Sequence, residues 1–266
     1  MKNIGDAAAA LLAYQASLRD TPTAAMRHAL APASQVLAGV GLPTNTREAY
    51  ALQDELIRQT GEVAGWKVGG ARAPEPNCAP VFASVLWNDA TPLPFDIAPE
   101  TEYECEIAFT FARDLPPRAQ PYSETEVAGA IGSTRAAVEL LAPRFAPPVN
   151  DAERLVSLAD GLGCGGLLVG QPVAGFVDVD CAAQPVRVAA DDMTVLERTG
   201  GNLAQRLLPL LCWLANHLAA RGLALRAGQT VTTGSWTGVR PWGSSRHVVA
   251  DFAGIGQVHV RPGKAA

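Results

Sequence analysis

The stretch TEYECEIAFTFARDLP, residues 101–116, decides how the middle of this chain folds. Its side chains alternate: one parity is aromatic or apolar, and the other carries Glu102, Glu104 and Glu106. Alternate side chains of a β-strand point to opposite faces, so the pattern predicts a strand with its glutamates on one face. Carboxylates this close repel one another unless solvent screens them or a cation lies between them. The pattern therefore agrees with two interpretations: a strand face exposed to solvent, and a binding site for a hard metal ion.

A second predicted strand, STRAAVELLAPRF (133–145), carries one further carboxylate, Glu139, between Val138 and Leu140. An ionised glutamate among apolar neighbours is costly to bury unless it is paired or bound to a cation. The alternative is a glutamate on a solvated edge. The functional interpretation makes Glu139 available to join Glu104 and Glu106.

A third predicted strand, VAGWKVGG (63–70), places Lys67 between Trp66 and Val68. A lysine in such a strand usually extends its ammonium group to solvent along an apolar stem. A partly desolvated ammonium would instead serve as an acid, a base or an anchor for a carboxylate. Spacing alone favours the first interpretation, and the paired glycines that follow favour a site.

The region before residue 62 is expected to be helical. Its pattern predicts helices over residues 5–19 and 24–38, and a third from the capping residue Asn45 to Gly61. Helix then gives way to strand, so we expect an N-terminal helical cap over residues 1–62 and a β-rich catalytic domain over 63–266.

The second half of the chain predicts short strands and one long helix. Residues 173–200 suit an antiparallel sheet, and Asn202 is expected to cap an apolar helix that runs to about Arg221. The C-terminal part predicts at least three more strands. It also contains a polar turn that could hold a ligand carboxylate or be an ordinary hairpin, formed by Ser235, Thr237 and Gly238.

The glycine-dense segment LADGLGCGGLLVG (158–170) has Asp160 near its start. It contains a GxGxxG string, but the following residues predict a strand. A dinucleotide-binding loop would require a helix there, so that interpretation is rejected.

Composition excludes several classes of protein. The 266 residues are 48% hydrophobic with a net charge of -5, and no run of Lys or Arg suggests nucleic-acid binding. The five cysteines are scattered without a CxxC pair, which predicts neither disulfides nor structural zinc and favours the cytoplasm. The longest apolar run, Leu207 to Ala220, is too short and too polar to span a membrane. The N-terminus lacks the features of a signal peptide.

Five segments occur in an order that resembles a known family: GWKVGG (65–70), EYECEIAF (102–109), AAVELLAPRF (136–145), LADGLGCGGLLVG (158–170) and GSWTGVRPW (234–242). They resemble the 2-oxo-4-pentenoate hydratases and 4-oxalocrotonate decarboxylases of the fumarylacetoacetate hydrolase superfamily. The E-x-E strand followed by a strand glutamate is the most specific part of this resemblance.

The resemblance implies an α+β fold, namely a mixed β-roll with an N-terminal helical region. It implies Mg²⁺ or Mn²⁺ held by Glu104, Glu106 and Glu139, which agrees with the preference of hard cations for oxygen ligands. Lys67 matches the family's lysine after GW. The remaining expected site residues are Asp160 for catalysis, and Ser235, Thr237 and Gly238 for substrate binding.

The activity implied is hydration of 2-hydroxy-2,4-dienoates to 4-hydroxy-2-oxo acids in aromatic degradation. The substrate would chelate the metal, and Lys67 would assist proton transfer between dienol and keto forms. The first alternative is a 4-oxalocrotonate-type decarboxylase. The same metal-bound site that stabilises an enolate would accept the electrons left when carbon dioxide departs. A catalytically weakened paralogue that binds a metal or a partner is the second. The expected partners are a small 2-oxo or 2-hydroxy acid, other copies of this chain in a homo-oligomer, and a pathway enzyme.

The sequence departs from the family pattern at three places. Asn77 lies near the position of an acidic residue, and Ala142 replaces an aspartate. The segment from Asp160 to Gly163 lacks the family's asparagine amide and serine hydroxyl. The substrate could therefore differ from the family's pentadienoate.

Overall fold

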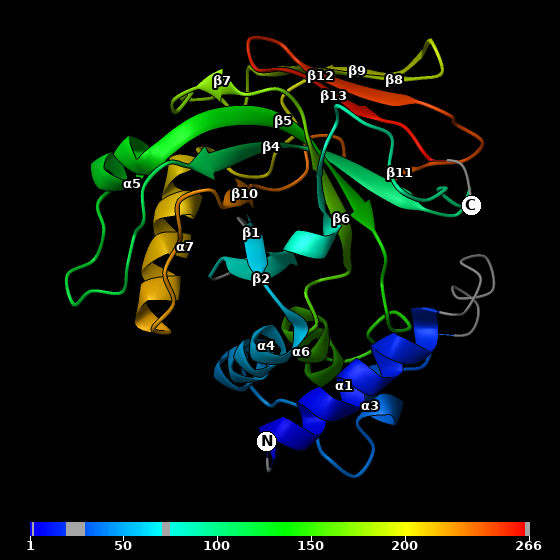
Figure 1. The fold of residues 1–266 in the computed structure, drawn as a ribbon, viewed down its shortest axis with the longest axis vertical. Coiled ribbons are helices and arrows are strands. Elements are labelled where there is room, and N and C mark those ends of the chain that lie inside the picture. The colour runs from blue at the N-terminus through cyan, green and yellow to red at the C-terminus, as the bar shows by residue number, and fades with distance from the viewer. Residues whose placement is uncertain (2, 20–29, 71–74, 264–266) are drawn as a thin grey trace.

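The computed structural model describes residues 1, 3–19, 30–70 and 75–263. The chain forms a large mixed β-sheet, a smaller antiparallel sheet and a layer of helices (Figure 1). In spatial order, the large sheet consists of β2 (Asn77–Phe82), β1 (Val63–Gly69), β10 (Thr230–Thr232), β4 (Glu102–Phe111), β5 (Ile131–Leu141), β6 (Cys164–Val169) and β3 (Leu86–Asn88). Two short strands lie off this path: β11 (Arg240–Pro241) pairs with β4, and β7 (Val173–Ala174) pairs with β5.

The smaller sheet covers the middle of the large one. Its order is β13 (Gly256–Val260), β12 (Val248–Phe252), β8 (Pro185–Ala190) and β9 (Met193–Thr199). Strands β12 and β13 contact β5, and the small sheet lies across β4 and β5 at the top of Figure 1. The expected antiparallel strands between residues 173 and 200 are confirmed.

Strand β4 is the centre of the large sheet, as the alternation in residues 101–116 predicts. One parity is completely buried, including Tyr103, Ile107 and Phe111 at 2%, 0% and 1% exposure. This face packs into the main core, where Tyr103 meets the Trp242 ring edge-on. The other parity carries the glutamates and continues into a small apolar cluster that includes Ala108. The glutamates therefore lie on the inner side of a curved sheet, close to its hydrophobic interior.

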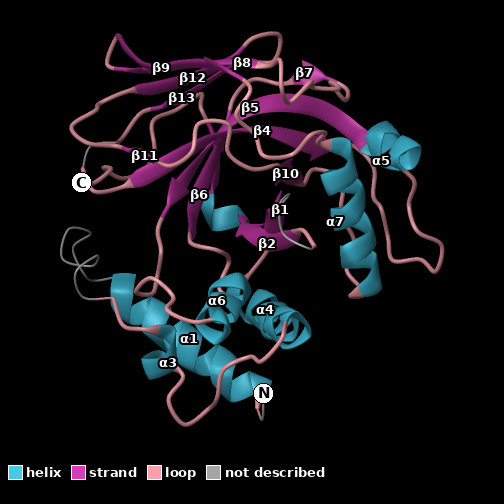
Figure 2. Cartoon of the chain, turned by 180° about the vertical axis from the view of Figure 1, so that it is seen from behind, coloured by secondary structure: helices cyan, strands magenta, loops and turns pink. Residues whose placement is uncertain are grey.

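The helices form two groups. At the bottom of Figure 1 a helical layer gathers α1 (Ile4–Arg19), α3 (Ala33–Val36), α4 (Thr46–Thr60) and α6 (Asp151–Ala159). At one side of the large sheet, α5 (Glu124–Ala130) packs against α7 (Leu208–Ala220), at the left of Figure 1 and the right of Figure 2. A 3₁₀ turn, η1 (Ala83–Val85), joins β2 to β3.

Helix α6 comes from the middle of the chain but shares a hydrophobic core with α1, α3 and α4. The helical layer therefore extends beyond residues 1–62, and the domain boundary at residue 62 stays a prediction. The fold as a whole confirms the expected α+β architecture with a mixed sheet and an N-terminal helical region.

The expected start of α4 is confirmed, since the Asn45 side chain accepts a hydrogen bond from the Glu48 N–H at 2.9 Å. The helix expected over residues 24–38 is only partly testable, because residues 20–29 lie outside the described residues. Within the described part only the four-residue α3 is helical, since Pro32 has an extended backbone at ψ 143°.

The expected cap at Asn202 is wrong, because α7 begins at Leu208. Pro209 fits the first turn of a helix, where its missing N–H has no partner to lose. The Asn202 amide instead donates hydrogen bonds to the carbonyl oxygens of Thr233 and Gly234, at 3.1 and 2.9 Å. Asn202 thereby holds the loop that follows β10.

The structure also bears on the predictions about disulfides and membrane spans. All five cysteines are free thiols. Among the described residues, no helix is both long enough and apolar enough to cross a membrane.

Candidate metal centre

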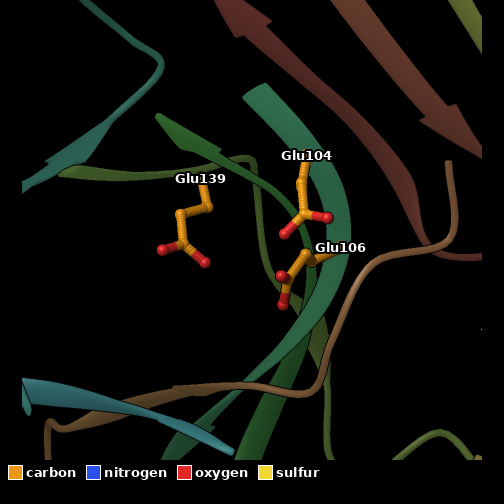
Figure 3. A group of neighbouring side chains, drawn as sticks. All are labelled: Glu104, Glu106 and Glu139. Atoms are coloured by element: carbon orange, nitrogen blue, oxygen red, sulfur yellow. The ribbon is translucent and has the colours of Figure 1, made fainter. Parts of the chain in front are cut away.

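Three carboxylates converge between strands β4 and β5. The antiparallel register places Glu104 directly opposite Glu139, and Glu106 follows two residues along the same face of β4. One carboxylate oxygen of each residue lies within 4.8 Å of those of the other two. Figure 3 shows the three carboxylates turned toward one shared space. Strand pairing therefore produces a cluster of oxygen atoms of the kind that Mg²⁺ and other hard cations prefer.

Two of these glutamates are buried, with exposures of 2% for Glu106 and 1% for Glu139. Glu106 accepts hydrogen bonds from the Thr232 hydroxyl and, at 2.8 Å, from the Gly234 N–H. Burial and the Glu139 carboxylate together raise the pKa of Glu106 to about 8. The same two causes raise the pKa of Glu104. Without a cation, this cluster thus holds negative charge at a cost.

One oxygen of the cluster is fully buried without a well-formed hydrogen bond. The Oε2 atom of Glu139 is buried and accepts no hydrogen bond. A buried carboxylate oxygen without a donor is unfavourable, and a divalent cation would satisfy it. The residues present therefore fit a metal ion of the hard, oxygen-binding type.

Lys67 reaches the same cluster from β1. Its ammonium group forms an ion pair with Glu139 and lies 3.4 Å from the carbonyl oxygen of Leu162. Burial by itself would lower the pKa of Lys67, but the negative charge of Glu139 raises it above its ordinary value. Lys67 is therefore a charged ammonium inside the site, and the interpretation of a solvent-facing lysine is wrong.

The space around the cluster consists of two neighbouring cavities. The smaller one, of about 140 Å³, is lined by Lys67, the three glutamates, Leu162 and Asn77. The larger one, of about 550 Å³, shares Glu104 and Gly234 with it and extends to the turn of Ser235, Thr237 and Gly238. The structure thus brings the predicted substrate-binding turn next to the predicted metal ligands.

The two hydroxyl groups of that turn differ in their bonding. Thr237 Oγ1 accepts a hydrogen bond from the Cys105 N–H at 3.1 Å and donates to the Gly238 carbonyl at 2.9 Å. Ser235 Oγ is buried and forms no well-formed hydrogen bond, although it is close enough to the Glu104 carboxylate to counteract in part the rise in the pKa of that group. Thr237 therefore holds the turn against β4, whereas Ser235 has a hydroxyl that is available to a ligand.

Asp160 lies elsewhere. Its carboxylate accepts hydrogen bonds from Arg144 and Gln15, and it lines a separate cavity of about 320 Å³ between the helical layer and the sheet. The structure does not bring Asp160 together with the three glutamates. Its catalytic role stays a prediction, and its contacts indicate that it joins β5 and α6 to the N-terminal helix.

Sequence reasoning missed two residues of the site. Thr232 points the same way as Glu106 because β10 pairs with β4 between Thr232 and Ala108. Leu162 has a left-handed backbone, φ 55°, which is uncommon for a leucine and turns its carbonyl oxygen toward Lys67. The alternating threonines of TVTT were a usable signal for the first residue, whereas no local signal marks the second.

The chain was also compared with known protein families, sequences and structures. No family model matches the chain. In sequence, the chain is 27% identical over 199 residues to a 2-keto-4-pentenoate hydratase from Burkholderia vietnamiensis, covering 70% of this chain and 74% of that protein. It is 24% identical to a TodF product hydratase from Pseudomonas putida, over 84% of this chain and 86% of the relative.

In structure, 4-oxalocrotonate decarboxylase from Pseudomonas putida G7, solved with calcium and acetate, matches with a TM-score of 0.70 at 18% identity. The match covers 94% of this chain and 96% of the decarboxylase. A fumarylacetoacetate hydrolase family protein from Yersinia pestis CO92 matches at a TM-score of 0.50 and 18% identity, over 74% of this chain and 90% of that one. The fold is therefore of the fumarylacetoacetate hydrolase type. In sequence, the chain is similar to 2-keto-4-pentenoate hydratases, which confirms the resemblance seen in its motifs.

A stability test follows from the crowding of the carboxylates. Replacing Glu104 with glutamine keeps the side-chain shape and removes one charge opposite Glu139. We expect the metal-free variant to be more stable than the original by about 1 kcal/mol, or roughly 2–4 °C in melting temperature. The stabilisation by added Mg²⁺ should become smaller at the same time. Scanning calorimetry with and without Mg²⁺ measures both, with the exposed Glu100→Gln as control, and a less stable metal-free variant would contradict the argument.

Proposed function

We propose that this protein is a divalent-metal-dependent hydratase. It would add water to 2-hydroxy-2,4-dienoates of the 2-oxo-4-pentenoate type and release 4-hydroxy-2-oxo acids. The observation that carries the proposal is the convergence of Glu104, Glu106 and Glu139 with Lys67 beside a cavity large enough for a small acid. The names of the relatives in sequence support the same reaction.

Mg²⁺ or Mn²⁺ is the proposed cofactor, with Glu104, Glu106 and Glu139 as its ligands. An all-carboxylate ligand set suits hard cations, and the structural neighbour is solved with calcium in one case and magnesium in another. When bound, such a cation polarises the C2 oxygen of a 2-oxo acid and offsets the negative charge of its enolate form.

Lys67 is the proposed proton carrier. The reaction first requires that the C2 hydroxyl proton leaves and that a proton is added at C5, which converts the dienol into an unsaturated ketone. A charged lysine at the edge of the cavity can donate the proton at C5, and the resulting amine can accept the hydroxyl proton. Water then adds at C4 with a proton at C3, which gives the 4-hydroxy-2-oxo acid.

Ser235 is the proposed contact for the substrate carboxylate or C2 oxygen, because it lines the larger cavity and its buried hydroxyl forms no well-formed hydrogen bond within the protein. Thr237 and Gly238 would shape the turn that presents it. Asn77 lies in the smaller cavity, where its amide could orient water in place of the acidic residue expected there. These assignments use groups that face the two cavities.

Decarboxylation of a 4-oxalocrotonate-type acid is the second candidate function. The structural match to 4-oxalocrotonate decarboxylase favours it, since that match extends over nearly all of both chains. The same Lys67 could protonate the carbon from which carbon dioxide departs. A weakened paralogue that binds a metal or a partner without turnover is the remaining alternative.

Hydrolysis of acylpyruvates is less well supported, because it requires a base that activates water. Among the described residues, no histidine lies in the carboxylate cavity. His217 is stacked on Trp213 next to Tyr50, and His247 and His259 are stacked on each other.

One pair of assays decides between the main candidates. Ultraviolet absorbance should show loss of 2-hydroxypenta-2,4-dienoate in the presence of Mg²⁺, and excess chelator should abolish this loss. Carbon dioxide release from 4-oxalocrotonate tests the second function on the same preparation. If neither acid is consumed while the protein still binds Mg²⁺, the hydratase proposal is wrong and a binding function gains support.

We also propose that the protein acts in the cytoplasm as a homo-oligomer, with a pathway enzyme as a further partner. The scattered free cysteines agree with a reducing compartment. Light scattering coupled to size-exclusion chromatography measures the oligomeric state, and a monomer at working concentration would contradict this part.

A further inference from the structure

The turn between α6 and β6, residues 160–164, has an unusual backbone. Three successive residues have positive φ angles: Gly161 at 90°, Leu162 at 55° and Gly163 at 70°. Glycine adopts such angles readily, but a leucine does so only where the surrounding structure holds it. Two contacts hold Leu162: its N–H donates to the Ser157 carbonyl at 2.8 Å, and its carbonyl accepts from the Lys67 ammonium at 3.4 Å. The turn therefore presents its central carbonyl group to the proposed proton carrier.

Arg144 holds both ends of this turn. One terminal nitrogen of its guanidinium group donates to the backbone carbonyl of Asp160, and the other donates to that of Cys164 at 3.1 Å. Its Nε atom donates to the Asp160 carboxylate, which also accepts a hydrogen bond from Gln15 of α1. All three nitrogens of one planar group are thus used on the first and the last residue of the turn. Because the guanidinium group is rigid, these bonds fix the distance between the two ends of the turn.

The clamp formed by Arg144 and Asp160 lies on the other side of the turn from Lys67. Both of its side chains line the 320 Å³ cavity, whereas Leu162 lines the cavity of the three glutamates. The clamp is largely enclosed, with side-chain exposures of 23% for Arg144 and 2% for Asp160. A Cβ atom at Gly161 would lie 3.2 Å from Nη2 of Arg144, which is tighter than an ordinary contact. The absence of a side chain at residue 161 therefore lets the guanidinium group approach the turn.

Lys67 has two acceptors in the described part of the chain, the Glu139 carboxylate and the Leu162 carbonyl. An ammonium group has three donors, so one remains for a substrate. A cation on Glu139 would compete with the ion pair, and the Leu162 carbonyl would then be the contact that still directs the ammonium group. We propose that Arg144 is a positioning residue for Lys67, which acts by holding the turn that carries this carbonyl. The proposal rests on the proposed function, because that function assigns proton transfer to Lys67.

The proposal gives Asp160 a role that differs from the expected catalytic one. Its carboxylate orients Arg144, and its backbone carbonyl is one of the two ends that Arg144 holds. Both groups act on the reaction only through the turn.

Kinetics of Arg144→Ala in excess Mg²⁺ test the proposal. We expect kcat for 2-hydroxypenta-2,4-dienoate to fall about 10- to 100-fold, since a small misplacement of a reacting group has an effect of this size. KM and the affinity for Mg²⁺ should stay within about threefold, because Arg144 lines neither cavity beside the glutamates. Millimolar guanidinium ion should raise kcat of the variant about threefold or more, because the 320 Å³ cavity admits the ion to the place of the missing side chain.

The position of Lys67 can be measured without turnover. In protein with isotope-labelled lysine, the NMR resonance of the Lys67 ε-carbon is identified by its loss in Lys67→Arg. For the original protein with Mg²⁺ we expect a resonance distinct from that of a solvent-exposed lysine. In Arg144→Ala the resonance should move toward the exposed position, and guanidinium ion should move it back.

Arg154 provides a matched control. It lies on α6, the helix that leads into the turn, and its exposed side chain pairs with Asp151. Arg154→Ala should keep kcat within about twofold, leave the Lys67 resonance unchanged and show no response to guanidinium ion. Should Arg144→Ala fail to fold, its combination with Asp160→Asn avoids burying an unpaired carboxylate, and the same losses and recoveries are expected.

The proposal is overturned if the folded variant keeps either the original kcat or the original Lys67 resonance, or if guanidinium ion restores neither. If the original protein consumes no dienoate but the Lys67 resonance depends on Arg144, the reaction assignment fails and the positioning of Lys67 by Arg144 stands. If the original protein consumes the dienoate and the resonance is unchanged in Arg144→Ala, the positioning fails and the reaction assignment stands.

Discussion

Replacing Glu139 with glutamine is expected to lower the affinity for Mg²⁺ by about a hundredfold or more. Among the three glutamates, Glu139 is the most buried, at 1% exposure, and it alone has a fully buried oxygen that accepts no hydrogen bond. Glutamine keeps the volume but presents a neutral amide, which binds a hard cation more weakly than a carboxylate. Calorimetric titration with Mg²⁺ and with Mn²⁺ measures the loss directly, and hydratase activity should disappear with it.

The Glu139 experiment has a control on the neighbouring strand. Glu102 has the same parity on β4 as Glu104 and Glu106, but it lies opposite Leu141 instead of another carboxylate. Glu102→Gln should leave Mg²⁺ affinity within about twofold of the original protein. Unchanged Mg²⁺ binding by a folded Glu139→Gln variant would remove Glu139 from the proposed ligand set.

The second large effect is expected at Lys67. Replacing it with methionine should lower kcat about 10²- to 10⁴-fold, the range typical of a lost proton-transfer group. Mg²⁺ binding should persist or become tighter, because the ammonium group pairs with Glu139 and competes with the cation for that carboxylate. The absorbance assay gives kcat, and titration with Mg²⁺ gives the affinity on the same sample.

A conservative variant separates charge from proton transfer at this position. Lys67→Arg keeps a positive charge but does not release a proton at neutral pH. We expect it to bind Mg²⁺ like the original protein and to be as inactive as Lys67→Met. Measurements should be made in Mg²⁺, since removing Lys67 leaves Glu139 buried and unpaired in the metal-free protein. A Lys67→Met variant with more than half of the original kcat would exclude Lys67 as the proton carrier.

Local patterns were sufficient for much of the fold. The alternation in residues 101–116 predicted β4 and its buried face, and capping residues such as Asn45 predicted where helices begin. The prediction failed at Asn202, because an asparagine before an apolar run is a cap only if the helix starts there. In the structure its amide is used by the β10 loop, a contact between segments about thirty residues apart.

Asp160 shows the same limit of sequence reasoning in the site. Asp160 belongs to a segment that resembles a family motif, yet Arg144 and Gln15 hold it in another cavity. Side-chain direction along one strand is local, whereas the cavity that a side chain faces depends on how sheets pack.

By itself, the sequence determined that Glu102, Glu104 and Glu106 share one strand face, because that follows from the two-residue period of a β-strand. It also determined that Glu139 lies in an apolar strand. Only the tertiary structure decided that Glu139 faces Glu104, that Lys67 pairs with Glu139 from β1, and that Glu102 lies opposite Leu141. The physical reason is that strand register and sheet curvature arise from contacts between distant segments, which no local period encodes.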